Sequence, residues 1–164
     1  MNYDRSEQSF IVDNMLKGLV KWLRIMGFST LYYEDLQKNK TAQEIESSDI
    51  FITASKTHIF NFSPENIVRI NSDDLADQLH ELDSRLDIFN SLNLFSICLN
   101  CNTPVEIISK DSINDKIPEK VRLHIEKFWY CPSCHKIYWR GGHVKRMLEK
   151  LKRLGIPIDF KNDF

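Results

Sequence analysis

Four cysteines, arranged as two Cys-x-x-Cys pairs, constrain the fold of this chain more than any other feature of its sequence. The pairs are Cys98–Cys101 and Cys131–Cys134, and 29 residues separate them. Two intervening residues allow both sulfur atoms of a pair to turn toward one metal ion, and two pairs supply the tetrahedral four-thiolate set that suits Zn²⁺. The spacing therefore predicts one structural zinc ion held by Cys98, Cys101, Cys131 and Cys134, with no open position for water.

Disulfide bonds and redox chemistry are alternative uses of cysteine pairs. Disulfides are typical of secreted proteins, whereas the first residues of this chain are polar and lack the apolar core of a signal peptide. A redox Cys-x-x-Cys motif would precede a helix and would not need a second pair. His135 follows the last cysteine and is a further potential ligand, which four thiolates make unnecessary. We therefore expect that removal of the metal unfolds the small cysteine-containing module.

The charge of the chain is divided between its two parts. The formal net charge is −1, but residues 1–97 hold 9 Lys and Arg against 15 Asp and Glu, whereas residues 98–164 hold 13 against 8. The opposite signs predict two functional surfaces or, alternatively, attraction between the two parts. No apolar run approaches about 20 residues, so we expect no membrane span. Without a signal sequence we expect a cytoplasmic protein.

The first part of the chain alternates between short apolar runs and helical periodicity. Runs of apolar and β-branched residues predict four extended segments, at 10–12, 30–33, 50–53 and 67–70. Apolar residues three and four positions apart predict helices over 14–26 and 75–89. We expect a loop over 34–40 and a short helix over 41–47. Strands that alternate with helices predict a parallel α/β sheet.

The composition changes from Ser96 onward. Cysteine, proline, tryptophan and glycine become frequent there, and the helical periodicity lapses until the end of the chain. We therefore predict an α/β domain over residues 8–95, with the boundary near 92–97. A small zinc ribbon follows over residues 96–155, and a basic helix at 143–154 closes it.

Acidic and hydroxyl side chains follow the predicted strands. Asp13 closes the first strand, Thr53 and Ser55 follow a later one, and Asp73 and Asp74 follow the last. Because ligands bind beyond the carboxyl ends of parallel strands, we expect these side chains at the edge that carries the site. The alternative role of the three aspartates is to cap the helices that begin after them.

Two motifs cover most of the chain, from about residue 9 to residue 150. The first is the run FIVDNMLKGLVKWLRIMGF over residues 10–28, and the second combines Cys98-x-x-Cys101-Asn102 with CPSCHKIYWRGGH over residues 131–143. Together with Gln78-Leu79, these motifs resemble the Mut-seven C-terminal RNase domain family. The resemblance implies a PIN-like α/β nuclease domain, a zinc ribbon after it, and RNA as the substrate class.

The acidic motif of that family is degraded in this chain. The family's first acid matches Asp13, but its second has no clear match in residues 37–44, unless a shifted alignment brings in Glu44 or Asp35. The third acid is replaced by Ser55, whose neutral oxygen attracts a divalent cation far less than a carboxylate does. We therefore favour an RNA-binding protein that has lost catalysis.

Two alternatives stay open. In the first, the chain is an active ribonuclease in which Asp13, Glu44 and Asp73 or Asp74 hold Mg²⁺ or Mn²⁺, which activates a water molecule. In the second, the chain is an adaptor whose acidic domain binds a basic protein partner.

Basic and aromatic residues in two segments are candidates for RNA contacts. In the first helix, Lys17, Lys21 and Arg24 recur at helical spacing. The C-terminal candidates are Trp139, Arg140, His143, Lys145 and Arg146. Basic side chains contact phosphates, and aromatic rings stack on bases. The alternative is a solvated helix face in the first segment and aromatic packing around the zinc in the second.

Overall fold

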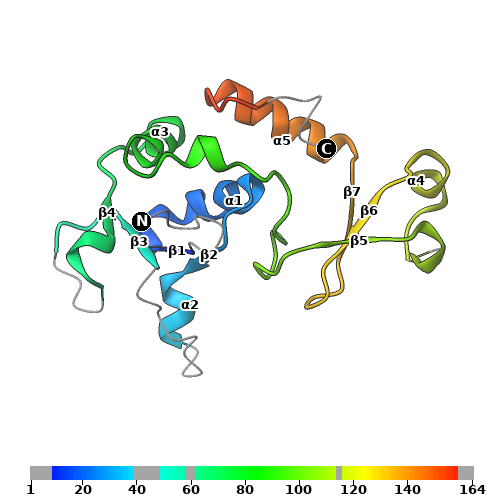
Figure 1. Cartoon of the computed structure of the whole chain (residues 1–164), viewed down its shortest axis with the longest axis horizontal. Helices are drawn as coiled ribbons and strands as arrows, with labels where there is room; N and C mark the ends of the chain where they lie inside the picture. Colours follow the sequence, from blue (N-terminus) through cyan, green and yellow to red (C-terminus); the bar gives the residue numbers. More distant parts are fainter. Residues whose placement is uncertain (1–8, 39–48, 58–61, 114–115, 159–164) are drawn as a thin grey trace. The chain divides into compact units, whose positions relative to one another are not determined.

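A computed structural model describes residues 9–38, 49–57, 62–113 and 116–158 of the chain (Figure 1). The chain divides after Asn102 into two compact units, Met1–Asn102 and Thr103–Phe164. The predicted boundary at 92–97 precedes this division by a few residues, because the first cysteine pair packs with the first unit. Within the described residues, no helix is long and apolar enough to span a bilayer.

The first unit contains the predicted parallel sheet. Its strands lie in the order β2-β1-β3-β4, and each neighbouring pair is parallel. Their bounds are β1 Phe10–Val12, β2 Thr30–Tyr32, β3 Ile50–Thr53 and β4 Ile67–Arg69. All residues of β1 and β3 are buried, which explains their continuous apolar sequence. The first strand is therefore central, and the residue that follows it lies in the middle of the carboxyl edge.

Helices pack against this sheet and against each other. A 3₁₀ turn, η2 (Asn14–Leu16), leads into α1 (Lys17–Met26), which contacts β1, β2 and α3 (Leu75–Leu86). Together η2 and α1 cover the helix predicted over 14–26. The helix predicted over 75–89 ends at Leu86, because Asp87 adopts the left-handed conformation and a 3₁₀ turn, η4 (Ile88–Ser91), follows. A further 3₁₀ turn, η3 (Pro64–Asn66), precedes β4.

The expectation of a loop over 34–40 is wrong for its first part. Residues Tyr33–Lys38 form helix α2. Glu34 and Asp35 lie in its first turn, where negative side chains stabilise a helix through its dipole. Tyr33 and Leu36 pack against the buried cluster of Ile11, Phe51 and Phe62, so tertiary contacts stabilise a segment whose own sequence is polar. The short helix expected over 41–47 lies outside the described residues.

The second unit is built on an antiparallel sheet. Its strands lie in the order β5 (Glu106–Ile108), β6 (Phe128–Tyr130) and β7 (Ile137–Trp139). A 3₁₀ turn, η5 (Lys110–Ile113), and helix α4 (Glu119–His124) connect β5 to β6, and helix α5 (Gly142–Arg153) follows β7. Ile113, Ile117 and Phe128 form a small buried core, against which Trp139 packs.

Candidate functional site

The four cysteines come together as the sequence predicts. Their Sγ atoms all lie within 4.8 Å of one another. Four sulfur atoms arranged tetrahedrally around Zn²⁺, with Zn–S bonds of about 2.3 Å, are about 3.8 Å apart. Cys98 and Cys131 are buried, Cys101 and Cys134 are partly buried, and none of the four forms a disulfide bond. The cluster therefore fits a tetrahedral metal ion, with thiolate as the only donor type.

The two cysteine pairs share one backbone geometry. The amide of Asn102 donates to the carbonyl of Cys98 at 3.0 Å, and the amide of His135 donates to the carbonyl of Cys131 at 2.9 Å. Both closing residues have a positive φ, 63° at Asn102 and 59° at His135. Each pair is thus a closed turn that presents its two sulfur atoms on the same side.

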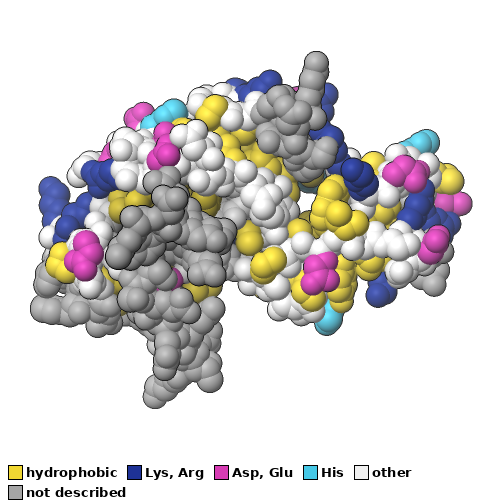
Figure 2. Space-filling model, in the orientation of Figure 1, with side chains coloured by type: hydrophobic (Ala, Val, Ile, Leu, Met, Phe, Trp, Pro, Cys, Tyr) yellow, Lys and Arg dark blue, Asp and Glu magenta, His cyan; other side chains and the backbone are white. Residues whose placement is uncertain are grey.

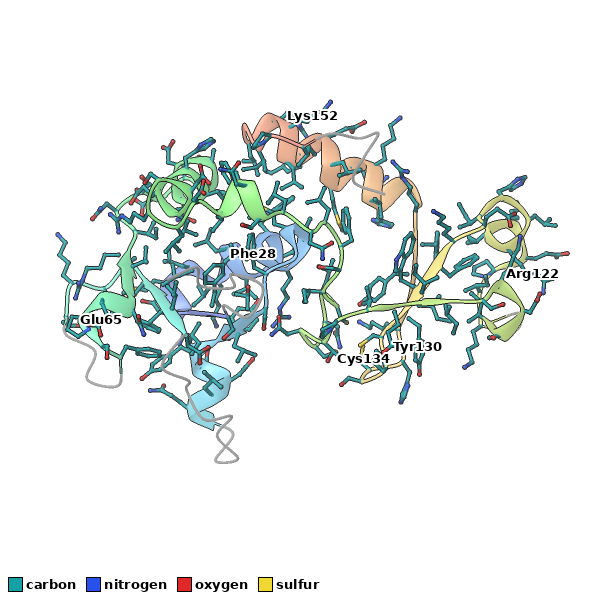
Figure 3. All side chains as sticks on the ribbon, viewed as in Figure 1. Phe28, Glu65, Arg122, Tyr130, Cys134 and Lys152 are labelled. Carbon is teal, nitrogen blue, oxygen red and sulfur yellow. The ribbon has the colours of Figure 1, made fainter. Side chains whose placement is uncertain are left out.

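His135 has a partner of its own beside the second pair. Its Nδ1 is hydrogen-bonded to the Tyr130 hydroxyl, and the two rings stack. Figure 3 shows Tyr130 and Cys134 near the connection between β6 and β7. The amide of Cys134 also donates to the Cys131 sulfur at 3.5 Å, a contact that stabilises a thiolate.

The first cysteine pair is attached to the α/β unit through Arg24 and Asn102. The Arg24 guanidinium donates to the carbonyls of Thr30, Leu99 and Asn100. Arg24 is only 6% exposed, and this burial lowers the pKa of its guanidinium. Arg24 therefore does not belong to an exposed basic stripe with Lys17 and Lys21, because its side chain turns beneath the returning chain.

Asp13 lies at the centre of the carboxyl edge of the parallel sheet, as expected. One carboxylate oxygen accepts a hydrogen bond of 2.6 Å from the amide of Met15, and the other accepts from the hydroxyl of Thr53. Asp13 is 8% exposed and is the N-cap of η2. Both of its oxygens thus have protein partners.

Ser55, expected from the resemblance to replace the family's third acid, is engaged in local hydrogen bonds. Its amide donates to the Thr53 hydroxyl at 2.9 Å, and its own hydroxyl lies 2.6 Å from that of Thr57. These bonds form a compact turn after β3. The position supplies a hydroxyl to this turn rather than a charge to the edge of the sheet.

The aspartates after β4 divide into a capping residue and an exposed one. Asp74 accepts hydrogen bonds from the amides of Ala76 and Asp77, at 2.8 and 3.4 Å, and is the N-cap of α3. Asp73 is exposed. Glu44, the other compensating carboxylate considered, lies outside the described residues.

Two carboxylates that sequence reasoning did not single out form specific contacts near this edge. Glu81 accepts from the amide of Asn71 at 3.0 Å and from the amide and hydroxyl of Ser72. Glu34 forms an ion pair of 3.1 Å with Lys17. Neither contact has a local spacing signal, because nine and seventeen residues separate the partners. Over the described ranges, one group of three or more His, Cys, Asp or Glu side chains is arranged so that it could hold a metal ion, and it consists of the four cysteines.

A positive surface lies along α5. Its exposed basic residues are Lys145, Arg146, Lys150, Lys152 and Arg153. Figure 2 shows Lys and Arg side chains where Figure 1 places this helix, and Figure 3 labels Lys152 on it. A pocket of about 470 Å³ lies at the start of α5, lined by Arg140, Gly141, Gly142, Lys145, Leu148 and Glu149.

The other predicted RNA contacts differ in their accessibility. Lys17, Lys21, Arg140 and His143 are exposed. His143 is hydrogen-bonded through its Nδ1 to Arg146 at 3.0 Å. Trp139, in contrast, is partly buried against the core of the second unit, which corresponds to the packing alternative for this residue.

A comparison with protein families agrees with this geometry. The model of a family described as the Mut7-C RNAse domain matches residues 8–151, which is most of the chain. No curated protein and no solved structure matches the chain.

Proposed function

Because the chain belongs to the Mut7-C RNAse domain family, we propose that it binds RNA without cleaving it. The main observation against cleavage is the shortage of available carboxylates at the carboxyl edge of the parallel sheet. Ser55 occupies the position of an acid, and both oxygens of Asp13 have protein partners. Metal-dependent phosphodiester hydrolysis needs carboxylates that hold a divalent ion beside the scissile bond. A single aspartate that already caps a 3₁₀ turn does not supply that set.

The basic face of α5 supports the RNA contact. Lys145, Arg146 and Lys150 are exposed within six residues of one helix. A helix rises about 1.5 Å per residue, so the basic residues of α5 from Lys145 to Arg153 are spread along about 12 Å. Phosphate contacts of this kind supply affinity with little dependence on base sequence. The basic face therefore suits the backbone of an RNA strand.

The four-cysteine cluster holds a structural zinc ion in this proposal. Four protein thiolates leave no position for water, so the ion acts on the fold and takes no part in chemistry. Its role is to fix the turn that precedes β5 and the turn that follows β6, and from the second turn the chain continues through β7 into α5.

An active ribonuclease is the second candidate, and one observation favours it. Asp13 retains the family's first acid in a nearly buried position at the centre of the sheet edge. In that case Asp13, with Glu44 and Asp73 or Asp74, would hold Mg²⁺ or Mn²⁺, which would supply an activated water molecule.

RNA binding can be tested by fluorescence anisotropy with labelled single-stranded RNA over a range of salt concentrations. The test variant carries Lys145→Gln, Arg146→Gln and Lys150→Gln. The control removes three exposed charges elsewhere, by Lys56→Gln, Arg69→Gln and Lys120→Gln. Each phosphate contact on a single strand contributes about 0.7 to the slope of log K against log salt. We expect the test variant to lose about 2 from that slope and the control to keep it.

The same preparations test cleavage. We expect the wild type and Asp13→Asn to leave labelled RNA intact with Mg²⁺ or Mn²⁺. Metal-dependent cleavage that Asp13→Asn abolishes would replace our proposal with the second candidate. Equal salt slopes for the α5 variant and its control would remove α5 as the RNA surface. Absence of RNA binding by folded, zinc-loaded protein would favour the adaptor hypothesis.

A further inference from the structure

A buried arginine lies directly beneath the first cysteine pair. Arg24 extends from α1, and its Nε and Nη2 donate to the carbonyl of Thr30 at 3.0 and 2.7 Å. Its Nη1 donates to the carbonyls of Leu99 and Asn100 at 3.1 and 3.3 Å. Leu99 and Asn100 are the two residues between Cys98 and Cys101. One guanidinium thus joins the start of β2 to the turn that carries two of the four thiols.

Asn102 attaches the other end of that turn to the same place. Its side-chain oxygen accepts from the amide of Thr30 at 2.7 Å, and its side-chain nitrogen donates to the hydroxyl of Ser29 at 2.9 Å. Its own amide closes the turn on Cys98. The conformation of the first cysteine pair is therefore determined by contacts with α1 and β2, seventy or more residues earlier in the chain.

The charge of Arg24 is placed where a metal–thiolate centre needs it. Four thiolates around one Zn²⁺ carry a net charge of −2. Burial lowers the pKa of the Arg24 guanidinium, and Tyr32, Cys98, Cys101 and Asp35 act against that effect. Among the described residues, its hydrogen bonds go to backbone carbonyls only, so its charge is not neutralised by a carboxylate at hydrogen-bonding distance.

We propose that Arg24 is a positioning residue of the metal site. It holds the Cys98–Cys101 turn in its metal-binding conformation and offsets part of the thiolate charge. This inference rests on the proposed zinc site, and it assigns to α1 a role in metal affinity. The guanidinium is suited to this role because its planar set of donors reaches three carbonyls on two chain segments. A lysine at position 24 would keep the charge but would lose most of these bonds.

The test measures zinc affinity of the full-length protein by competition with a chromophoric chelator. The variants are Arg24→Met, which removes charge and bonds, and Arg24→Lys, which keeps the charge. Loss of a group that orients a metal ligand typically costs 10–100-fold in affinity. We expect a loss of at least about 10-fold for Arg24→Met and an intermediate loss for Arg24→Lys.

Two controls on the same helix separate this role from general stability. Lys21→Met removes an exposed charge one turn earlier, and Leu19→Ala opens a cavity at a fully buried position of α1. We expect Leu19→Ala to lower the melting temperature strongly while zinc affinity stays close to that of the wild type. Replacement of zinc by Co²⁺ gives a second readout, because its visible spectrum reports the thiolate geometry.

Each outcome decides the proposal. Arg24 variants with wild-type zinc affinity, or with a loss no larger than that of Leu19→Ala, would overturn it. If Arg24→Met does not fold, the comparison of Arg24→Lys with Lys21→Met decides in the same way. If elemental analysis finds no metal bound to the wild type, the zinc proposal itself fails, which is a distinct result from zinc binding that is insensitive to position 24.

Discussion

Gly27 permits a close approach of two backbone segments that a single methyl group would prevent. Its φ is 97°, and a Cβ atom built at this position would lie 2.1 Å from the carbonyl oxygen of Asn93. At this junction the amide of Asn93 donates to Met26 and the amide of Phe95 donates to Ile25, at 3.0 and 2.8 Å. The segment then continues to the first cysteine pair, so the junction positions the metal site as well as the end of α1.

The structure sets the magnitude expected for Gly27→Ala. The left-handed conformation costs a residue with a side chain about 1–2 kcal/mol. An ordinary contact would need a shift of more than about 1 Å, which would break the two backbone hydrogen bonds at about 0.5–1.5 kcal/mol each. The reduced freedom of the unfolded chain returns about 0.4–1 kcal/mol. We therefore expect a net loss of about 1–5 kcal/mol in the free energy of unfolding.

Urea denaturation followed by circular dichroism measures this change, and Gly18→Ala is the matched control. Gly18 lies exposed in α1, and a Cβ atom there would have nothing within 4 Å. Alanine is favoured over glycine in a helix by about 1 kcal/mol, so we expect this control to be stabilised. Two substitutions that are identical in chemistry should thus shift stability in opposite directions. A shift in the same direction for both, or an unchanged midpoint for Gly27→Ala, would refute the reasoning.

Two further predictions concern the acids after β4. Asp74→Ala removes the N-cap residue of α3 and should cost about 0.5–2 kcal/mol of stability. Asp73→Ala should change stability little, because Asp73 is exposed and does not cap the helix. Equal losses for the two variants in urea denaturation would contradict this assignment. The Ser72 hydroxyl and the amides of Asn71 and Ser72 lower the pKa of Glu81 against a smaller effect of burial. A carboxyl whose pKa is lowered by folding stabilises the protein above its ordinary pKa of about 4.5, and that contribution disappears as the pH falls through the lowered value. Glu81→Gln should therefore reduce stability near pH 6, and its difference from the wild type should shrink as the pH falls below 4.5, which denaturation over this pH range measures.

Several elements follow from patterns a few residues long. The two Cys-x-x-Cys pairs predict the cluster because the spacing brings together the two sulfur atoms within each pair, and a tetrahedral metal ion needs two such pairs. The central strands and α1 follow from runs and periodicities that each segment carries within itself. Asp13 is placed correctly for the same reason, since it comes directly after a buried strand and before a helix.

Other features depend on partners that are far away in the sequence. Lys17, Lys21 and Arg24 share a helical spacing, yet Arg24 is buried because residues 99 and 100 return above it. The polar segment of α2 is helical because Tyr33 and Leu36 reach a core built from other strands.

The sequence by itself therefore determined the four-cysteine group, the central strands and the position of Asp13. Only the tertiary structure decided which charged side chains are hydrogen-bonded to distant residues. Asp13 accepts a hydrogen bond from Thr53, and Arg24 donates to the turn of the first cysteine pair. The physical reason is that spacing along a chain determines which face of an element a residue occupies. What that residue meets depends on segments brought back by the fold, and no local pattern records them.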